Sequence, residues 1–125
     1  MLDTHIALWA VVGSRALPPR ARQAILAADE VFVSVASVWE VAIKHAIGKG
    51  EMPVSAGQAA QAFEDAGYQL LDISLPHVVH VEQLPMLHKD PFDRMLVAQA
   101  HVEPLTLITA DEQVARYGGP VMCLA

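Results

Sequence analysis

Four carboxylates that lie far apart in the sequence are the side chains best suited to chemistry: Asp3, Glu40, Asp93 and Asp111. Carboxylate oxygens are the ligands that Mg²⁺ and Mn²⁺ prefer in proteins. Four bare carboxylates brought together would repel one another, and bound divalent cations remove that penalty. In two-metal nuclease sites, such ions lie about 4 Å apart, activate water and stabilise the leaving oxygen of a phosphodiester. If the four acids converge, they predict this chemistry.

Each acid also has a purely structural interpretation when it is taken alone. Asp3 precedes a predicted helix and can cap the free N–H groups of its first turn. Glu40 stands four residues before Lys44 on another predicted helix, so the two can form an ion pair across one turn. These roles are the more common ones for single acids. Only the joint pattern of four acids favours a metal site.

The two remaining acids lie at further predicted helix starts. Thr109 and Glu112 have the spacing of a capping box, which would make Asp111 an ordinary first-turn acid. In "DPFD", Asp90 stands at the N-cap, a proline follows it at the first helical position, and Asp93 lies in the first turn. We interpret Asp90 as the cap, whereas Asp93 would lie beside the positive end of the helix with its carboxylate free for another role.

The elements that must position these acids alternate along the chain. Strands are predicted at a stub formed by residues 2–3 and at residues 31–34, 68–73, 104–109 and 121–124. Helices are predicted through Ala10 after the stub, over 19–28, 35–47, 56–66 and 75–84, after Asp90, and briefly from about Asp111. Such alternation favours a parallel sheet covered by helices on both faces, with right-handed crossovers.

The predicted sheet explains how the acids could meet. Asp3 and Asp111 each follow a strand, so both would lie at the carboxyl edge, where open α/β sheets bind ligands. Glu40 lies in the first turns of the helix after the 31–34 strand, and Asp93 begins the helix that leads into the 104–109 strand. We therefore expect the four carboxylates to surround one pocket.

The helix over 35–47 carries the clearest apolar stripe, and we expect that stripe to face the core. Its members are Val35, Val38, Trp39, Ala42, Ile43, Ala46 and Ile47. Glu40 lies off the stripe, on a flank with Ser37 and Lys44. Trp9, Trp39 and Phe92 are likewise interpreted as residues of the core or of a dimer contact.

Composition limits the classes of protein that fit. The 125 residues suit one domain, residues 1–125, and 54% of them are apolar without a run long enough to span a membrane. The single cysteine, Cys123, excludes an internal disulfide and favours a reducing compartment, so a cytoplasmic location is expected. The net charge of −6 gives no general basic footprint for nucleic acid. Binding would need bound cations or local patches, of which Arg15, Arg20 and Arg22 form one candidate and Lys44 and Lys49 another.

Several stretches of the sequence resemble the PIN-domain nucleases, and most closely the VapC-type toxins of bacterial toxin–antitoxin pairs. The matching stretches are "LDTHIALW", "SVASVWEVAIKHAIGKG", "LHKDPFDRMLVAQA" and "LTLITAD", which occur in the order of the family and cover nearly the whole chain. The resemblance implies a three-layer α/β/α domain with a central, mostly parallel sheet of four to five strands. Relatives carry a few more residues before "LDTH", so the strand that positions Asp3 is expected to be short.

The resemblance also implies a function and maps it onto residues. The four acids of the family correspond to Asp3, Glu40, Asp93 and Asp111, which would bind Mg²⁺ or Mn²⁺ in a metal-dependent endoribonuclease. The implied partners are an RNA substrate, a cognate antitoxin protein and a second copy of the chain. Asp90 and Arg94 belong to the motif of this subgroup, and Arg94 could meet either a phosphate or a carboxylate.

Other functions fit the sequence less well. An aspartyl phosphatase needs a second Asp two residues after the first, where His5 stands, and neither a G-x-G-x-x-G motif nor a P-loop is present. His77 and His80 are spaced as zinc ligands, but no third ligand is evident. No chemical role is assigned to His88. The alternative that remains is a non-catalytic module of the same fold that binds an antitoxin or nucleic acid without cleavage.

Overall fold

Short parallel strands run through the middle of the molecule, which is described by a computed structural model over residues 1–48, 50 and 52–125. Strand β1 (Phe32–Ser34) pairs with β2 (Gln69–Leu71), and β3 (Leu107–Thr109) pairs with β4 (Val121–Cys123), both in parallel. Leu2 makes isolated parallel bridges to Val33 and Ile108. One residue of the expected first strand therefore joins the two ladders in the order β2, β1, Leu2, β3, β4.

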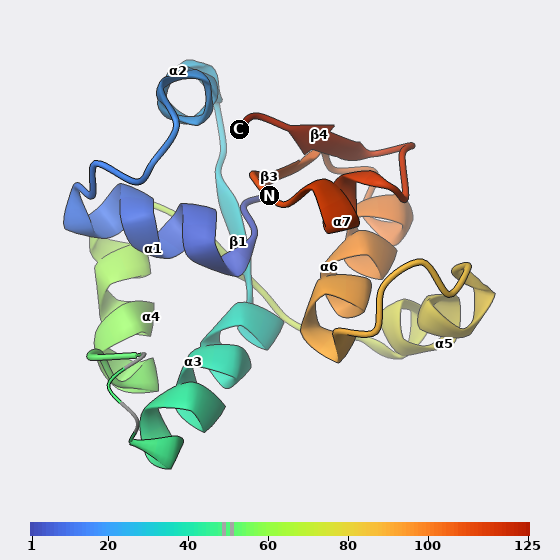
Figure 1. Ribbon diagram of the computed structural model, residues 1–125, viewed down its shortest axis with the longest axis horizontal. Helices are drawn as coiled ribbons and strands as arrows, with labels where there is room; N and C mark the ends of the chain where they lie inside the picture. The colour runs from blue at the N-terminus through green and yellow to red at the C-terminus, as the bar shows by residue number, and fades with distance from the viewer. Residues whose placement is uncertain (49, 51) are drawn as a thin grey trace.

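Helices connect and cover these strands, as Figure 1 shows. Their bounds are α1 (Thr4–Val12), α2 (Pro19–Ala27), α3 (Val35–Ile47), α4 (Ala56–Asp65), α5 (Leu75–Gln83), α6 (Pro91–Val102) and α7 (Glu112–Ala115). The predicted helices are confirmed to within about two residues at their ends. Among the described residues, no helix has the length and apolarity needed to cross a lipid bilayer.

Two apolar clusters, one on each face of the strands, form the core. Because side chains alternate along a strand, adjacent residues of β3 enter different clusters: Leu107 packs with Leu96 of α6, whereas Ile108 packs with Phe63 of α4 and Ile6 of α1. In Figure 1, α1 and α4 lie on one side of β1 and α6 on the other. The expected α/β architecture, with parallel strands and flanking helices, is confirmed.

The expectation that the apolar stripe of α3 faces the core is wrong for most of its members, although Val38 packs against the cluster that contains Val41. Trp39 is 56% exposed, Ile43 40% and Ile47 58%. The helix instead buries a narrower face made of Ala36, Ser37, Glu40 and Val41. Helix α3 begins immediately after β1, with Ser34 as both last strand residue and N-cap, so small side chains are needed where it approaches the sheet. Periodicity defines a stripe but not the neighbour that it contacts.

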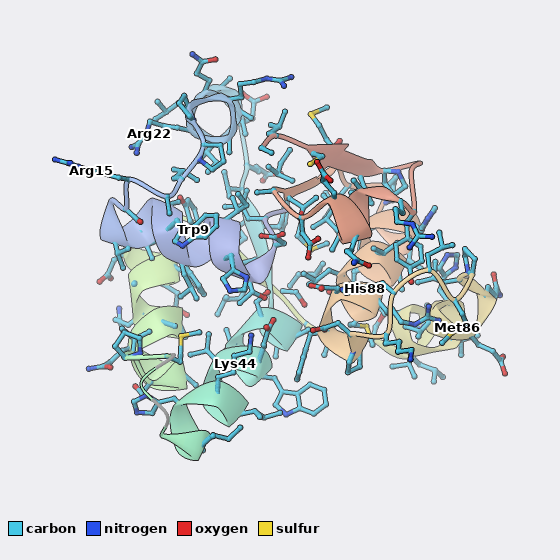
Figure 2. All side chains as sticks on the ribbon, viewed as in Figure 1. Trp9, Arg15, Arg22, Lys44, Met86 and His88 are labelled. Atoms are coloured by element: carbon cyan, nitrogen blue, oxygen red, sulfur yellow. The ribbon has the colours of Figure 1, made fainter. Side chains whose placement is uncertain are left out.

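The three arginines noted in the sequence lie away from the cavity at the strand ends. Arg15, Arg20 and Arg22 are all exposed on or near α2. Figure 2 shows Arg15 and Arg22 at the α2 end of the molecule, far from Lys44 and His88. Lys49 lies outside the described residues, so only Lys44 of the second predicted group can be placed.

Candidate active site

The carboxyl ends of β1 and β3, the residue after Leu2, and the start of α6 surround one cavity of about 390 Å³. The four acids predicted from the sequence all line it: Asp3, Glu40, Asp93 and Asp111. The other residues that line it are Thr4, His5, Trp9, Lys44, His88, Asp90 and Ala110. Figure 2 labels three of these, Trp9 on α1, Lys44 on α3 and His88 before α6, which approach the same opening from different elements.

Asp3 combines a capping role with a place in the cavity wall. Its Oδ1 accepts a hydrogen bond from the backbone N–H of Ile6 at 2.9 Å, so the predicted N-cap of α1 is confirmed. Its Oδ2 accepts a hydrogen bond from the hydroxyl of Thr109 at the end of β3. Burial to 6% exposure raises the pKa of the Asp3 carboxyl, and these two hydrogen bonds oppose the rise.

Glu40 is held by hydrogen bonds to both carboxylate oxygens. The hydroxyl of Thr4 donates to Oε1 at 2.7 Å, and the Lys44 ammonium donates to Oε2 at 2.6 Å. The predicted i, i+4 ion pair therefore exists, and the Glu40 side chain that takes part in it is only 5% exposed. The hydrogen bond that Lys44 donates to Glu40 is the main reason that the pKa of Lys44 is raised. Lys44 is thus a charged group within the acidic cavity.

Asp93 is the centre of a smaller cluster at the start of α6. Asp90 caps the helix as predicted, since its Oδ1 accepts from the N–H groups of Phe92 at 2.9 Å and Asp93 at 3.0 Å. The Nε2 atom of His88 lies 2.8 Å from Oδ2 of Asp93. Ligand atoms of His88, Asp90 and Asp93 all lie within 4.8 Å of one another, the one such group of three among the described residues.

The environment of Asp93 disfavours its ionised form. Burial, together with the charges of Asp90 and Glu40, raises the pKa of the Asp93 carboxyl to about 6, although the His88 hydrogen bond opposes the rise. A divalent cation bound here would reverse that preference because it attracts the carboxylate form.

Asp111 lies at the exposed lip of the cavity and is the N-cap of α7. Its Oδ1 accepts from the N–H of Gln113 at 2.8 Å. The suggested capping box starting at Thr109 is wrong, because the Thr109 hydroxyl accepts from the N–H of Asp111 at 3.0 Å and donates to Asp3. Thr109 thereby fixes Asp3 and Asp111 relative to one another across two chain segments.

Arg94 does not pair with a carboxylate, one of the two partners considered from the sequence. Its buried guanidinium donates from Nη1 to the carbonyl of Pro85 and the hydroxyl of Tyr117, both at 2.9 Å, and from Nη2 to the carbonyl of Val81 at 3.1 Å. Tyr117 in turn accepts from the N–H of His88 at 3.2 Å. Arg94 therefore anchors the segment that carries His88, and its charge does not face the cavity.

The donor set fits a hard divalent cation. Five carboxylates and the Lys44 ammonium line the cavity. The two imidazoles of the cavity also lie beside acids, His5 near Asp3 and His88 near Asp93. Oxygen donors of this kind select Mg²⁺ or Mn²⁺ over softer metals. Among the described residues, the ligand atoms that come this close together belong to His88, Asp90 and Asp93, so a ligand set drawn from Asp3, Glu40, Asp93 and Asp111 stays a prediction.

Comparisons with known proteins agree with this architecture. The family model described as the PIN domain matches residues 1–120. None of the curated protein sequences matches the chain significantly. Among solved structures, the chain is similar to a toxin–antitoxin complex from Klebsiella pneumoniae, with a TM-score of 0.69 and 20% identity over 99% of this chain and 96% of that chain.

A second solved structure is VapBC2 from Rickettsia felis bound to a DNA fragment from its promoter. The TM-score is 0.67, with 17% identity over 98% of this chain and 95% of that chain. At such low sequence identity, these two matches show only that this chain shares the fold of both proteins.

Proposed function

The chain belongs to the PIN domain family, and from this premise we propose that it is a metal-dependent endoribonuclease, the toxin of a toxin–antitoxin pair. The observation that carries the proposal is the convergence of Asp3, Glu40, Asp93 and Asp111, from four separate segments, on one cavity. A fold alone does not define an activity, so the argument rests on this site.

Bound Mg²⁺ or Mn²⁺ would supply Lewis-acid chemistry, lowering the pKa of water and neutralising charge on the phosphodiester. The protein's own residues hold the carboxylates in place. Thr109 orients Asp3, Thr4 and Lys44 orient Glu40, and His88 orients Asp93. In-line attack of water on phosphorus would leave a 5′-phosphate and a 3′-hydroxyl. Cations in the cavity also explain how a chain with a net charge of −6 could approach RNA.

One contact favours a non-catalytic module instead. Lys44 already neutralises Glu40, so an internal cation stands where part of a metal site would be. Titration with Mn²⁺ separates the two functions. An active site should bind Mn²⁺ and lose affinity when Asp3 is replaced by Asn, whereas a binding-only module should show little affinity in either protein.

Incubation with total RNA tests the proposed activity directly. With Mg²⁺ present, we expect the purified protein to produce discrete fragments with 5′-phosphate ends. Addition of a chelator should stop the reaction, and excess Mg²⁺ should restore it, because the carboxylates alone cannot activate water. Cleavage that continues unchanged in excess chelator, or no cleavage with either metal, would contradict the proposal.

The proposed antitoxin would be recognised by the charge of the cavity. A basic side chain of the partner, an arginine above all, could enter between the carboxylates and replace the cations, because a guanidinium forms paired hydrogen bonds with carboxylates. Such a contact would inhibit the enzyme by occupying the metal site.

The exposed stripe on α3 suggests where two copies of the chain would meet. Trp39 packs edge-on against Phe92 of α6, with 5.0 Å between ring centroids, so the stripe continues onto a second helix. We expect Ile43→Glu to convert a dimer into a monomer, because it places a charge in an apolar contact. Light scattering after size exclusion measures the mass. Leu26→Glu, an exposed leucine on α2, is the matched control and should remain dimeric. A dimeric Ile43→Glu variant would exclude this face.

A further inference from the structure

One rim of the acidic cavity is aromatic, although nothing in the proposed hydrolysis requires aromatic groups. His5 and Trp9 stand four residues apart on α1, with ring centroids 5.7 Å apart and ring planes tilted by 46°. Both line the same cavity as Asp3 and Asp93. His5 is exposed and Trp9 is half-buried. Both side chains therefore border the space beside the carboxylates.

Helix α1 fixes the position of this rim relative to the candidate metal ligands. Asp3 is the N-cap of the helix, so His5 and Trp9 follow it within the first two turns. At 1.5 Å of rise per residue, Trp9 lies about 9 Å along the helix axis from Asp3. A group bound at the carboxylates would thus have an aromatic surface to one side, within reach of a neighbouring sugar and base.

Packing makes Trp9 a fixed surface rather than a mobile side chain. Part of its indole packs against the apolar cluster that contains Ile6 and Phe63. The remainder faces the cavity. The other tryptophan, Trp39, lies on α3 and does not line this cavity, so the two indoles have different surroundings.

We propose that His5 and Trp9 form a stacking site for the nucleobase next to the scissile phosphodiester. This inference rests on the proposed function and narrows its substrate to unpaired nucleotides. A base within an A-form duplex is stacked on its neighbours and cannot reach a side chain, whereas bases in single strands and loops can turn out and stack on aromatic rings. Because every base has a π face, such stacking tolerates different sequences.

Fluorescence of Trp9 tests the site without any need for cleavage. The chain has two tryptophans, so Trp39→Phe leaves Trp9 as the only indole. In this background with Mg²⁺, we expect saturable quenching by adenosine 5′-monophosphate and none by ribose 5-phosphate, which lacks the base. Equal effects of the two ligands would overturn the inference. Quenching by acetyl-arginine amide but not by the nucleotide would also overturn it, because the rim would then fit a basic peptide.

Cleavage kinetics provide a second measurement on a single-stranded oligoribonucleotide. Trp9→Leu should raise KM about ten- to a hundredfold with a smaller effect on kcat, since one stacked base is lost. Trp9→Phe should recover most of the affinity, and Leu26→Ala, at an exposed residue of α2 outside the cavity, should behave as the wild type. Thermal unfolding of each variant confirms that it folds. Unchanged KM in Trp9→Leu overturns the stacking site alone, whereas absence of cleavage by the wild type contradicts the proposed function and leaves the fluorescence result to decide the stacking site.

Discussion

Replacing Asp93 with Asn is expected to abolish RNA cleavage and, at the same time, to make the metal-free protein more stable at neutral pH. Activity is lost because Asn cannot supply the charged oxygen that the proposed ion requires, and a fall of at least about a hundredfold is expected. Stability rises because the variant no longer carries a half-buried charge beside Asp90 and Glu40. If Asp93 had only a structural role, its replacement by Asn would not both abolish cleavage and raise stability.

The dependence on pH follows from the raised pKa. The Asp93 carboxyl has a pKa of about 6 in the folded protein against its ordinary value of 3.8, so protonation of this side chain favours folding. The stability that protonated Asp93 contributes to the folded protein is fully present below about pH 4 and is lost as pH rises through about 6. The gain from Asp93→Asn at pH 8 is therefore at most about 3 kcal/mol, and solvent exposure reduces it.

Urea unfolding in chelator at pH 4 and pH 8 measures this difference. The two proteins should have similar free energies of unfolding at pH 4 and diverge at pH 8. Asp29→Asn, which removes an exposed acid between α2 and β1, is the control and should follow the wild type at both values. Cleavage retained by Asp93→Asn would refute the role of Asp93, and parallel stability curves would refute the electrostatic account.

Replacing Arg94 with Met is expected to lower the free energy of unfolding by about 2–4 kcal/mol. The methionine keeps much of the apolar stem but leaves the carbonyls of Pro85 and Val81 and the Tyr117 hydroxyl without their donor. Arg94→Lys should be intermediate, because one ammonium cannot replace a planar group that reaches three acceptors. Urea unfolding at pH 7 measures each change.

The same variant should weaken metal binding indirectly. Arg94 holds the segment before α6 through Tyr117, which accepts from the N–H of His88, and His88 contacts Asp93. Arg116→Met is the control, since Arg116 makes a single exposed contact to the carbonyl of Leu87 at 3.2 Å. An Arg94→Met protein as stable as this control would show that the buried contacts contribute little.

The sequence predicts the helices better than the strands, for local reasons. The bounds of α3 are correct at both ends because Ser34 accepts from the N–H of Ala36 at the start and Gly48 adopts a φ of 71° at the end, a conformation that suits glycine. Strand ends depend instead on where a distant partner stops. The predicted strand over 104–109 is therefore three residues longer than β3, although its apolar pattern is genuine.

The positions of the four acids follow from strand order and the carboxyl-edge rule, but the groups around them do not. His88 reaches Asp93 from a segment without periodicity, and no local pattern indicates that the Arg94 side chain turns toward Pro85. The sequence also does not show which way the apolar stripe of α3 faces, because it does not identify the surface that the stripe contacts. The His5–Trp9 pair had a usable signal, since two aromatic rings four residues apart follow a predicted N-cap acid.

Leu2, the one residue that bridges both ladders, lies at the boundary between two halves of the molecule. Backbone hydrogen bonds join Leu2 to Phe32 on one side and join Met1 and Asp3 to Ile108 on the other, so this segment links the two ladders. Glu40 belongs to the half that contains β1, Asp111 follows β3 in the other half, and Asp3 lies at the boundary itself. An ion shared by these carboxylates would therefore cross-link the halves, so that loading the site would stiffen the sheet against shear as well as prepare it for chemistry.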